Sequence, residues 1–375
     1  MDLARRRWYA PGEGSEHPLD RLLDAAEATV SVGVRQLCCE LGMDGRSFAR
    51  CVQRLKSAAQ LTMGEELFRQ IVEIEGKAAL ALSAKEELEV GWSASQCKTT
   101  APSGQEVSRL YCSADGVMVA TIQQAEKDKH RVRVLERRKR MPRAKRRRLA
   151  RLRAVKKGTD QRYKQVYVTS FYDQSQEHRL VGVTRGGVGG LSRLLRGDAA
   201  RVLLRGAQER RGMVDGAVCL RSNLEILPLD EVMLDFYHFS EHVGEAGKAT
   251  LGEEEAKEWI HTVLHLARNI GYEPMFQQLL DWRGKLRGGK RCVADRLIHY
   301  VAQRREMMGY ERCDEHGWDV GSGPMESMCG VTTDRIKGRG RRWNLENAEA
   351  VMELEALHQS SLWQRYWDKA FACCN

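Results

Sequence analysis

The spacing of apolar residues changes twice along this 375-residue chain, and each change marks a region that must fold differently. Between residues 18 and 94 apolar positions recur at helical spacing. The first stripe of this region consists of Leu19, Leu22, Leu23 and Ala26. From Leu110 the period falls to two, which is typical of strands, and from Glu253 it returns to that of helices. The sequence therefore predicts a helical N-terminal region, a sheet-containing core and a helical insertion.

Short runs rich in Val, Tyr, Thr and Phe predict the strands of the core. The expected elements are strands over 110–119, 165–171 and 179–184, a helix over 191–207, and two strands over 212–220 and 231–236. This order predicts an α/β (α+β) fold in which helices pack on a mixed sheet. The expected regions are 1–104 (helical), 105–242 (first part of the core, with a basic insertion at 127–164), 243–315 (helical insertion, with helices over 253–270, 275–286 and 292–308) and 316–375 (C-terminal helical part of the core).

Two short helices separated by a glycine-containing turn are expected inside the N-terminal region. Residues 32–41 and 47–55 flank the sequence Gly42-Met43-Asp44-Gly45. A short turn of this kind sets the second helix at an angle suited to the DNA major groove. A plain helical hairpin has the same pattern, so the sequence leaves a helix-turn-helix and a structural hairpin open.

The charge of the chain favours a polyanionic partner. Its 61 Lys and Arg residues outnumber 51 Asp and Glu residues, which gives a net charge of +10. No apolar run approaches the ~20 residues that cross a bilayer, and the first residues lack the apolar segment of a signal peptide. We therefore expect a cytoplasmic protein that binds nucleic acid and no membrane.

Eleven cysteines are present, and their pattern argues against two kinds of site. Two pairs are adjacent in sequence, Cys38 with Cys39 and Cys373 with Cys374, and the total is odd, so a disulfide framework is not expected. No Cys-x-x-Cys pair occurs, which argues against a zinc ribbon or finger. The sequence predicts reduced thiols.

The most basic segment, residues 127–164, lies between the first two predicted strands. It includes Arg146, Arg147 and Arg148. Such a block is either a solvated loop or exposed helix, or a strip that contacts the phosphate backbone and gains affinity from counterion release. Because it interrupts a sheet, it must project from that sheet, which favours the phosphate contact.

Two acidic residues interrupt apolar strands, and each is followed by glycine. Asp115 lies in Ala114-Asp-Gly-Val, and Asp215 lies in Val214-Asp-Gly-Ala. A carboxylate beside a buried strand is costly unless it is paired or binds a cation. An Asp-Gly turn is the structural alternative for either one alone. The repetition of the pattern favours a functional site.

A third acid, Glu326, follows the glycine-rich sequence Gly321-Ser-Gly-Pro-Met, in which Pro324 is expected to begin a helix. An acid in a first helical turn also simply favours the helix dipole. Three acids from separate elements suit Mg²⁺ or Mn²⁺, which prefer oxygen ligands and retain several waters. Two such ions about 4 Å apart activate an attacking oxygen and stabilise a leaving oxygen in phosphoryl transfer.

Asp235, His238 and His242 fall on one face if a helix begins near Asp235. They are candidates for an accessory role in the active site, and a hydrogen-bonded structural cluster is the alternative. Asp235 also competes with Asp215 as the second carboxylate. His238 is less suited to bind magnesium directly, because imidazole favours other metals.

The segment after Glu326 combines cations with an aromatic residue, as a nucleic-acid groove does. Its candidate phosphate contacts are Arg335, Lys337, Arg339, Arg341 and Arg342. Trp343 is expected to stack on an exposed base, with packing in the core as the alternative.

Taken together, these motifs resemble the Asp-Asp-Glu transposases of bacterial insertion sequences, particularly the Kra-type group, over roughly residues 105–367. The resemblance rests on Ala114-Asp-Gly-Val-Met-Val, Tyr167-Val-Thr-Ser-Phe-Tyr-Asp, Val214-Asp-Gly-Ala, Leu234-Asp-Phe-Tyr-His-Phe-Ser-Glu-His242, Gly321-Ser-Gly-Pro-Met-Glu, Arg335-Ile-Lys-Gly-Arg-Gly-Arg-Arg-Trp343, Ala348-Glu-Ala and the segment Trp363 to Trp367. It implies an RNase H-like core in which Asp115 ends the first strand, Asp215 follows the fourth, and Glu326 sits on a late helix.

The resemblance also implies a function. It implies metal-dependent cleavage and strand transfer at insertion-sequence ends, with Asp115, Asp215 and Glu326 as catalytic metal ligands for two Mg²⁺ or Mn²⁺ ions. The partners would be double-stranded DNA, as terminal repeats and target, and further copies of the chain in a dimer or larger assembly. A non-catalytic DNA-binding protein derived from a transposase, and a metal-dependent nuclease without strand transfer, are the alternatives.

Overall fold

The computed structural model describes residues 8–11, 14–16, 30–149, 151–152, 154–155, 157–338 and 340–372. The helical stripe predicted from Leu19, Leu22, Leu23 and Ala26 lies outside these residues, as does Arg339. Near the start of the chain, β1 (Trp8–Ala10) and β2 (Gly14–Glu16) form a small antiparallel ribbon. The sequence predicted an entirely helical N-terminal region, and this ribbon shows that the region also contains two short strands.

Three helices follow, α2 (Val32–Asp44), α3 (Phe48–Ala59) and α4 (Glu65–Ala84). The side chain of Ser47 caps α3 by accepting a hydrogen bond from the Arg50 backbone N–H at 3.2 Å. The turn between α2 and α3 lies at residues 45–47, later than predicted. Gly45 is required there, because a Cβ atom would lie 2.0 Å from Cys51 Sγ.

The core is a mixed sheet, which confirms the predicted fold class. Its strands are β3 (Lys98–Thr100), β4 (Glu106–Ala120), β5 (Tyr163–Tyr172), β6 (Arg179–Thr184), β7 (Glu209–Val214) and β8 (Glu231–Leu234). The order across the sheet is β6-β5-β4-β7-β8, and β3 pairs with β4. β4, β5 and β6 are antiparallel neighbours, whereas β4, β7 and β8 run parallel. This arrangement is consistent with an RNase H-like sheet.

Helices α7 (Gly187–Arg201) and α14 (Gly323–Asp334) cover opposite faces of this sheet. Thr169 of β5 contacts Asp198 of α7. In the pairing of β5 with β4, Thr169 lies opposite Ala114, so Ala114 points to the same face of the sheet. The next residue of β4, Asp115, contacts Cys329 of α14 instead. Because successive residues of a strand point to opposite faces, the two helices lie on different sides of the sheet.

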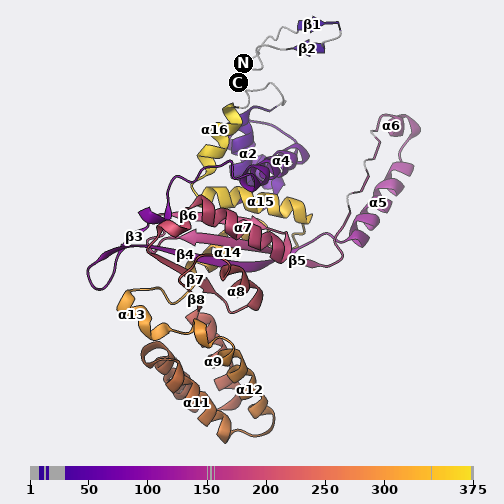
Figure 1. Ribbon diagram of the computed structural model, residues 1–375. Coiled ribbons are helices and arrows are strands. Elements are labelled where there is room, and N and C mark those ends of the chain that lie inside the picture. The colour runs from indigo at the N-terminus through magenta and orange to yellow at the C-terminus, as the bar shows by residue number, and fades with distance from the viewer. Residues whose placement is uncertain are drawn as a thin grey trace.

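The remaining helices extend these layers. α15 (Leu345–Gln359) packs against β6 and α4, and so joins the N-terminal helices to the sheet. α8 (Val218–Leu224) packs on β4, and α16 (Trp363–Ala372) contacts α2 and α15. Figure 1 shows α2, α4, α15 and α16 together on one side of the sheet.

A separate group of helices lies on the other side of the molecule (Figure 1). It comprises α9 (Phe236–Thr250), α10 (Glu253–His265), the π-helical η3 (Leu266–Ile270), α11 (Tyr272–Lys285), α12 (Gly288–Ala302), η4 (Arg305–Met307), η5 (Tyr310–Arg312) and α13 (Cys313–His316). Its core includes Trp259 and Trp282, whose ring centroids are 4.4 Å apart. The helical insertion is present, and it begins at Phe236 rather than at residue 243.

The basic segment forms an arm that leaves the core between β4 and β5 (Figure 1). It contains α5 (Gln124–Lys139) and α6 (Arg143–Arg147), and neither helix has a buried residue. Residues 127–157 hold 17 Lys and Arg against two acids, a net charge of +15, whereas the whole chain carries +10. The rest of the chain therefore has a net charge of −5, and the arm supplies the basic character of the molecule.

Two predicted elements differ from the structure. The strand expected over 212–220 ends at Val214, and the apolar run after it forms α8. Asp215 Oδ1 accepts a hydrogen bond from the Ala217 N–H at 2.8 Å, and Gly216 has φ +91°, so the chain turns out of the sheet at this point. The helix expected over 191–207 begins earlier and ends at Arg201, and η2 (Leu204–Gly206) follows it.

Replacement of Glu353 by Gln is expected to stabilise the protein above neutral pH. Burial raises the pKa of this α15 side chain from 4.5 to about 7, and Ser83 donates a hydrogen bond to it at 2.5 Å. Because the folded protein holds the proton of Glu353 more tightly than the unfolded chain, this group adds its full stability below about pH 4.5, and that stability is lost as the pH rises through about 7. At pH 8 the variant should gain up to roughly 3 kcal/mol in urea unfolding, and almost nothing at pH 4.5. Glu258→Gln, an exposed control, should change neither value.

Candidate active site

Asp115 and Asp215 lie at the same level on adjacent parallel strands. The register of β4 and β7 joins Ser113 to Met213, and each acid lies two residues farther along its chain. β4 continues to Ala120 beside β5, so Asp115 does not end its strand as expected, and lies instead where β7 leaves the sheet. Level residues of neighbouring strands are roughly 5 Å apart and share a face. The two acids are therefore neighbours at the end of the parallel part.

Helix α14 packs directly on Asp115. Oδ1 of Asp115 accepts a hydrogen bond from the Gly116 N–H at 2.5 Å, and Oδ2 accepts one from Cys329 Sγ at 3.5 Å. Burial and the neighbouring Asp115 carboxylate raise the pKa of Cys329, so the thiol keeps its proton and acts as a donor. Because Glu326 lies three residues before Cys329, it shares this face of α14.

Glu326 lies in the first turn of α14, with Pro324 as the second helical residue rather than the first. Its side chain is 60% exposed, and Oε1 is 3.8 Å from His238 Nε2. The other ring nitrogen of His238 is 3.5 Å from Glu241. His238 is thus placed to orient Glu326 or to contact a ligand of it.

Asp235 is fully buried, and both of its carboxylate oxygens are engaged. Oδ1 accepts hydrogen bonds from the N–H groups of Tyr237 at 2.6 Å and His238 at 3.1 Å, and thereby caps α9. Oδ2 accepts from the Ser322 N–H and from Ser322 Oγ, the residue that precedes α14. Asp235 therefore joins the N-termini of α9 and α14, whereas Asp215 is half-buried and its Oδ2 has no hydrogen bond among the described residues. This favours Asp215 as the second carboxylate.

The contacts of His242 in the described structure are with the helical insertion rather than with the three acids. Its ring packs at a tilt of 43° against the ring of Tyr300 on α12, with centroids 4.1 Å apart, at the edge of a cavity of about 440 Å³. Burial lowers the pKa of His242, so the ring is neutral near pH 7. An accessory role of His242 beside Asp235 and His238 stays a prediction, because the Tyr300 ring that it contacts has its hydroxyl beside Gly216, the residue after Asp215.

The helical insertion contributes two side chains that the sequence analysis missed. Arg304 donates from Nε and Nη2 to the Gly216 carbonyl at 3.1 and 2.5 Å, and its guanidinium lies 3.8 Å from the centroid of the Tyr300 ring. Burial, with smaller contributions from Arg304, Asp215 and Asp235, places the pKa of Tyr300 at about 12, and its hydroxyl has no partner among the described residues. No local motif marks either residue, because they lie more than 80 positions beyond Asp215.

Gly216→Ala is expected to lower the free energy of unfolding by about 2–3 kcal/mol. A left-handed φ of +91° disfavours any side chain, and a Cβ atom would lie 2.7 Å from Arg304 Nε and 2.8 Å from Leu234 Cδ1. Urea unfolding measures the change. Gly244→Ala is the matched control, because this α9 glycine has open space around it and should gain up to about 1 kcal/mol. Equal effects of the two variants would contradict the strained turn.

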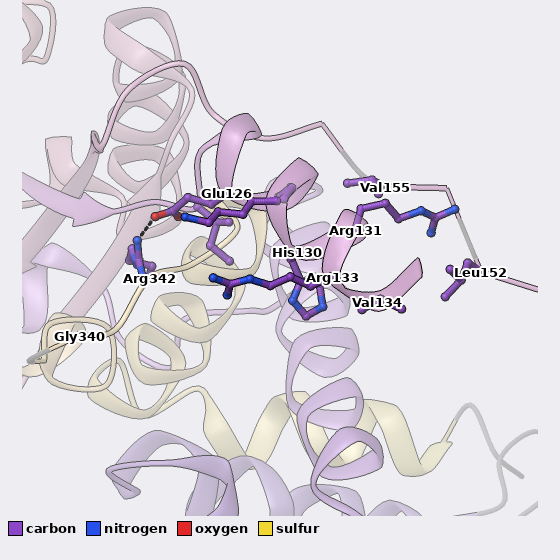
Figure 2. Close-up of a pocket in the computed structure, with 12 residues that line it drawn as sticks. Glu126, His130, Arg131, Arg133, Val134, Leu152, Val155, Gly340 and Arg342 are labelled. Carbon is purple, nitrogen blue, oxygen red and sulfur yellow. Dashed lines mark hydrogen bonds and ion pairs between the residues drawn. The ribbon is translucent and has the colours of Figure 1, made fainter. Parts of the chain in front are cut away.

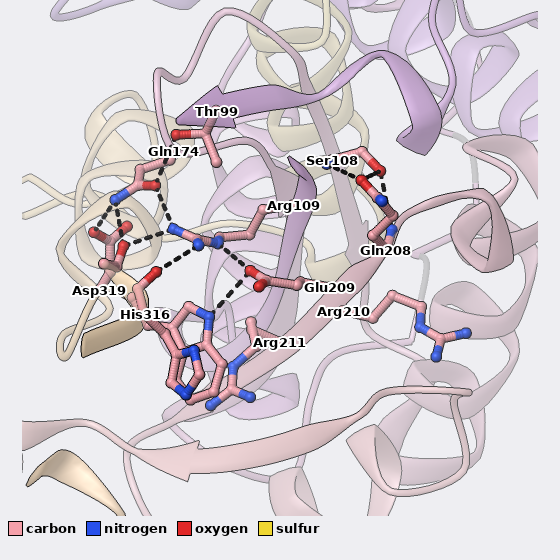
Figure 3. Close-up of polar contacts among 12 residues, drawn as sticks. Thr99, Ser108, Arg109, Gln174, Gln208, Glu209, Arg210, Arg211, His316 and Asp319 are labelled. Carbon is pink, nitrogen blue, oxygen red and sulfur yellow. Dashed lines mark hydrogen bonds and ion pairs between the residues drawn. The ribbon is translucent and has the colours of Figure 1, made fainter. Parts of the chain in front are cut away.

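A buried arginine fixes the loop that leads into α14 (Figure 3). Arg109 on β4 is 1% exposed and donates to Glu209, to Gln174 and to the carbonyls of His316 and Gly317, at 2.5–2.8 Å. Each of its three guanidinium nitrogens donates to an oxygen, and Glu209 supplies the opposite charge that burial of a cation requires. The loop is therefore held to the same strand that carries Asp115.

The predicted DNA contacts divide into buried and exposed groups. Arg335 is 6% exposed, donates to the Gly42 carbonyl at 2.8 Å and lies 4.4 Å from the Phe48 ring centroid. Trp343 is 7% exposed, and its indole N–H donates to the Ile336 carbonyl at 3.2 Å. The expectations of a phosphate contact at Arg335 and base stacking at Trp343 are wrong, because each side chain packs inside the protein.

The other candidate cations remain at the surface. Arg146, Arg147, Arg148 and Lys337 are exposed, whereas Arg341 is half-buried and donates to the carbonyls of Asp334 and Arg335. Arg342 pairs with Glu126 at the base of the arm, as Figure 2 shows. A cleft of about 810 Å³ lies there, lined by His130, Arg131 and Arg133 of α5. Four of these five exposed cations, Arg146, Arg147, Arg148 and Arg342, thus lie on the arm or at its base.

The three carboxylates are more widely spaced than the ligands of a single ion. Among the described residues, the group of three whose ligand atoms all lie within 4.8 Å of one another is Cys97, Asp173 and His178. Asp115, Asp215 and Glu326 do not form such a group. Metal binding by these three acids therefore stays a prediction.

A scan against models of protein families found no match, and a search of curated proteins found no similar sequence. Among the described residues, no helix combines the length and apolar character that a bilayer crossing requires. The cysteines in the described part of the chain are free thiols, as predicted.

Proposed function

We propose that this chain is a transposase that cleaves and joins DNA at the ends of an insertion sequence, with Asp115, Asp215 and Glu326 as the metal-binding carboxylates. The observation that carries the proposal is the level placement of Asp115 and Asp215 on parallel strands, with the helix of Glu326 packed on Asp115. The sheet order and the projecting basic arm also support it.

The chemistry consists of two displacements at phosphorus. In the first, water forms a bond to phosphorus at the transposon end, the bond to the 3′ oxygen breaks, and a 3′ hydroxyl is released. In the second, this hydroxyl attacks a phosphorus of target DNA and displaces a 3′ oxygen there. Two Mg²⁺ or Mn²⁺ ions at the carboxylates would supply Lewis acidity for both.

The residues of the chain hold the parts in place. Asp235 fixes the start of α14, Cys329 holds the Asp115 carboxylate, and His238 lies beside Glu326. The arm supplies the positive charge that attracts the phosphate backbone, because the rest of the chain has a negative net charge. Much of the catalysis in phosphoryl transfer is such positioning and charge compensation.

The test is an assay of the purified chain with labelled DNA fragments that flank its own coding sequence and a supercoiled target. With Mg²⁺ or Mn²⁺ we expect cut ends and a joined product, and with Ca²⁺ or chelator we expect binding without cleavage. Cut ends that never join would favour a nuclease. Binding without cleavage in any metal would favour a non-catalytic DNA-binding protein.

A further inference from the structure

A second cluster of metal-ligating side chains lies apart from the three acids. Cys97 directly follows η1 (Ala94–Gln96) and precedes β3. Asp173 directly follows β5 and His178 directly precedes β6, so these two residues close the loop of the β5–β6 hairpin. One ligand atom from each of the three residues lies within 4.8 Å of the other two.

The cluster is enclosed on one side and open on the other. Cys97 is fully buried and Asp173 is 3% exposed, whereas the His178 side chain is 28% exposed. Trp92 packs edge-on against the His178 ring, with centroids 5.4 Å apart. His178 is therefore the member of the cluster that solvent reaches.

The hydrogen bonds of the hairpin explain two of the three side chains. Asp173 accepts from the His178 N–H at 3.2 Å, from His178 Nδ1 at 2.7 Å and from Ser175 Oγ at 3.0 Å, which is sufficient to close the loop. The thiol of Cys97 has no part in that arrangement. Its hydrogen bond is a long one, 3.8 Å to the Ser93 carbonyl.

Charge and chemistry select the kind of ion. A thiolate and a carboxylate together carry −2, so a divalent cation makes the buried cluster neutral and removes the cost of placing two anions side by side. Sulfur, nitrogen and oxygen ligands together suit Zn²⁺, whereas Mg²⁺ requires oxygen. Ligands of tetrahedral zinc are about 3.3–3.6 Å apart, so binding would require only small shifts of the three side chains.

We propose that Cys97, Asp173 and His178 form a Zn²⁺ site with water as the fourth ligand. The ion clamps the segment before β3 to the β5–β6 hairpin, and so links residues 76 positions apart in the chain. The loss of the Cys97 proton on binding makes the affinity rise with pH. The site does not depend on the proposed DNA chemistry, because none of its residues touches the three acids.

The test is metal binding by the full chain after treatment with a chelator. Titration with Zn²⁺ against a chromogenic chelator should show one tight site, and Co²⁺ should give a thiolate-to-cobalt charge-transfer band. Cys97→Ser should abolish this band, and Cys97→Ser and His178→Gln should each weaken zinc binding by ~100-fold or more.

Matched variants separate this site from other thiols and from the proposed active site. Cys292→Ser removes an exposed thiol on α12, and Asp115→Asn removes a proposed magnesium ligand; both should keep the cobalt band. If Cys97→Ser fails to fold, His178→Gln decides, because its side chain is partly exposed. A native chain without the band, or tight zinc binding that survives His178→Gln, would overturn the proposal.

Discussion

Asp115→Asn and Glu326→Gln are each expected to slow DNA cleavage by about 10³-fold or more, while DNA affinity stays within about threefold. An amide keeps the shape of the side chain and removes the charge that would bind a metal ion, and in the proposed mechanism the metal ions stabilise the attacking and the leaving oxygen. A factor of 10³ corresponds to about 4 kcal/mol of transition-state stabilisation. Asp215→Asn should behave in the same way. Single-turnover cleavage and filter binding measure the two quantities.

Two control variants separate loss of a metal ligand from a general effect of removing an acid. Glu254→Gln changes an exposed acid at the start of α10 and should leave cleavage unchanged. Asp235→Asn should lower stability by about 1–3 kcal/mol, because it weakens the hydrogen bonds that start α9 and α14. If Asp235→Asn abolished cleavage at unchanged stability while Asp215→Asn remained active, the second carboxylate would be Asp235.

Removal of the arm is expected to weaken DNA binding by about 10³-fold at 0.1 M salt. The arm carries a net charge of +15, and each phosphate contact adds roughly 0.9 to the slope of log affinity against log salt. A short Gly-Ser linker in place of residues 127–157 preserves the base, where Gln124 and Thr159 are hydrogen-bonded at 3.3 Å. The measurements are the dissociation constant and its salt dependence.

The thermal stability of the deletion variant should match that of the native chain, because α5 and α6 bury no side chain. A finer test replaces Arg146, Arg147 and Arg148 by Gln. If all three contact phosphates, the salt slope should become shallower by up to about 2.7. Unchanged affinity in both variants would show that DNA binds elsewhere on the protein.

The strands of the sheet were predicted from the sequence more accurately than the points at which they end. Strands β4, β5 and β6 follow the pattern of β-branched and aromatic residues closely, because burial on both faces leaves little choice of side chain. The run 217–220 was assigned to a strand, but Ala217 caps α8 and the other three residues begin that helix. Four apolar residues fit a buried strand or a short helix equally well, and only the turn at Gly216 decides between them.

Arg335 and Trp343 show why the surface was harder to predict than the core. A cation near an aromatic residue fits a nucleic-acid groove, and it also fits a folded segment in which the cation stacks on rings, as Arg335 does on Phe48. The partner ring lies almost 290 residues away, so no local pattern reveals it. Cys97 is a similar case, although the spacing of Asp173 and His178 around one hairpin loop was visible in the sequence.

The contact between Arg335 and the turn of α2 and α3 has a mechanical consequence. Arg335 immediately follows α14, and Gly76 of α4 touches α15 so closely that a Cβ atom would lie 2.2 Å from the Ala350 carbonyl oxygen. The N-terminal helices are therefore packed directly against α15 and the end of α14, the helix that carries Glu326, and are not joined to the core by a flexible linker alone. If α3 binds DNA and the three acids cleave it, this rigid contact fixes the number of base pairs between the bound sequence and the cleavage site.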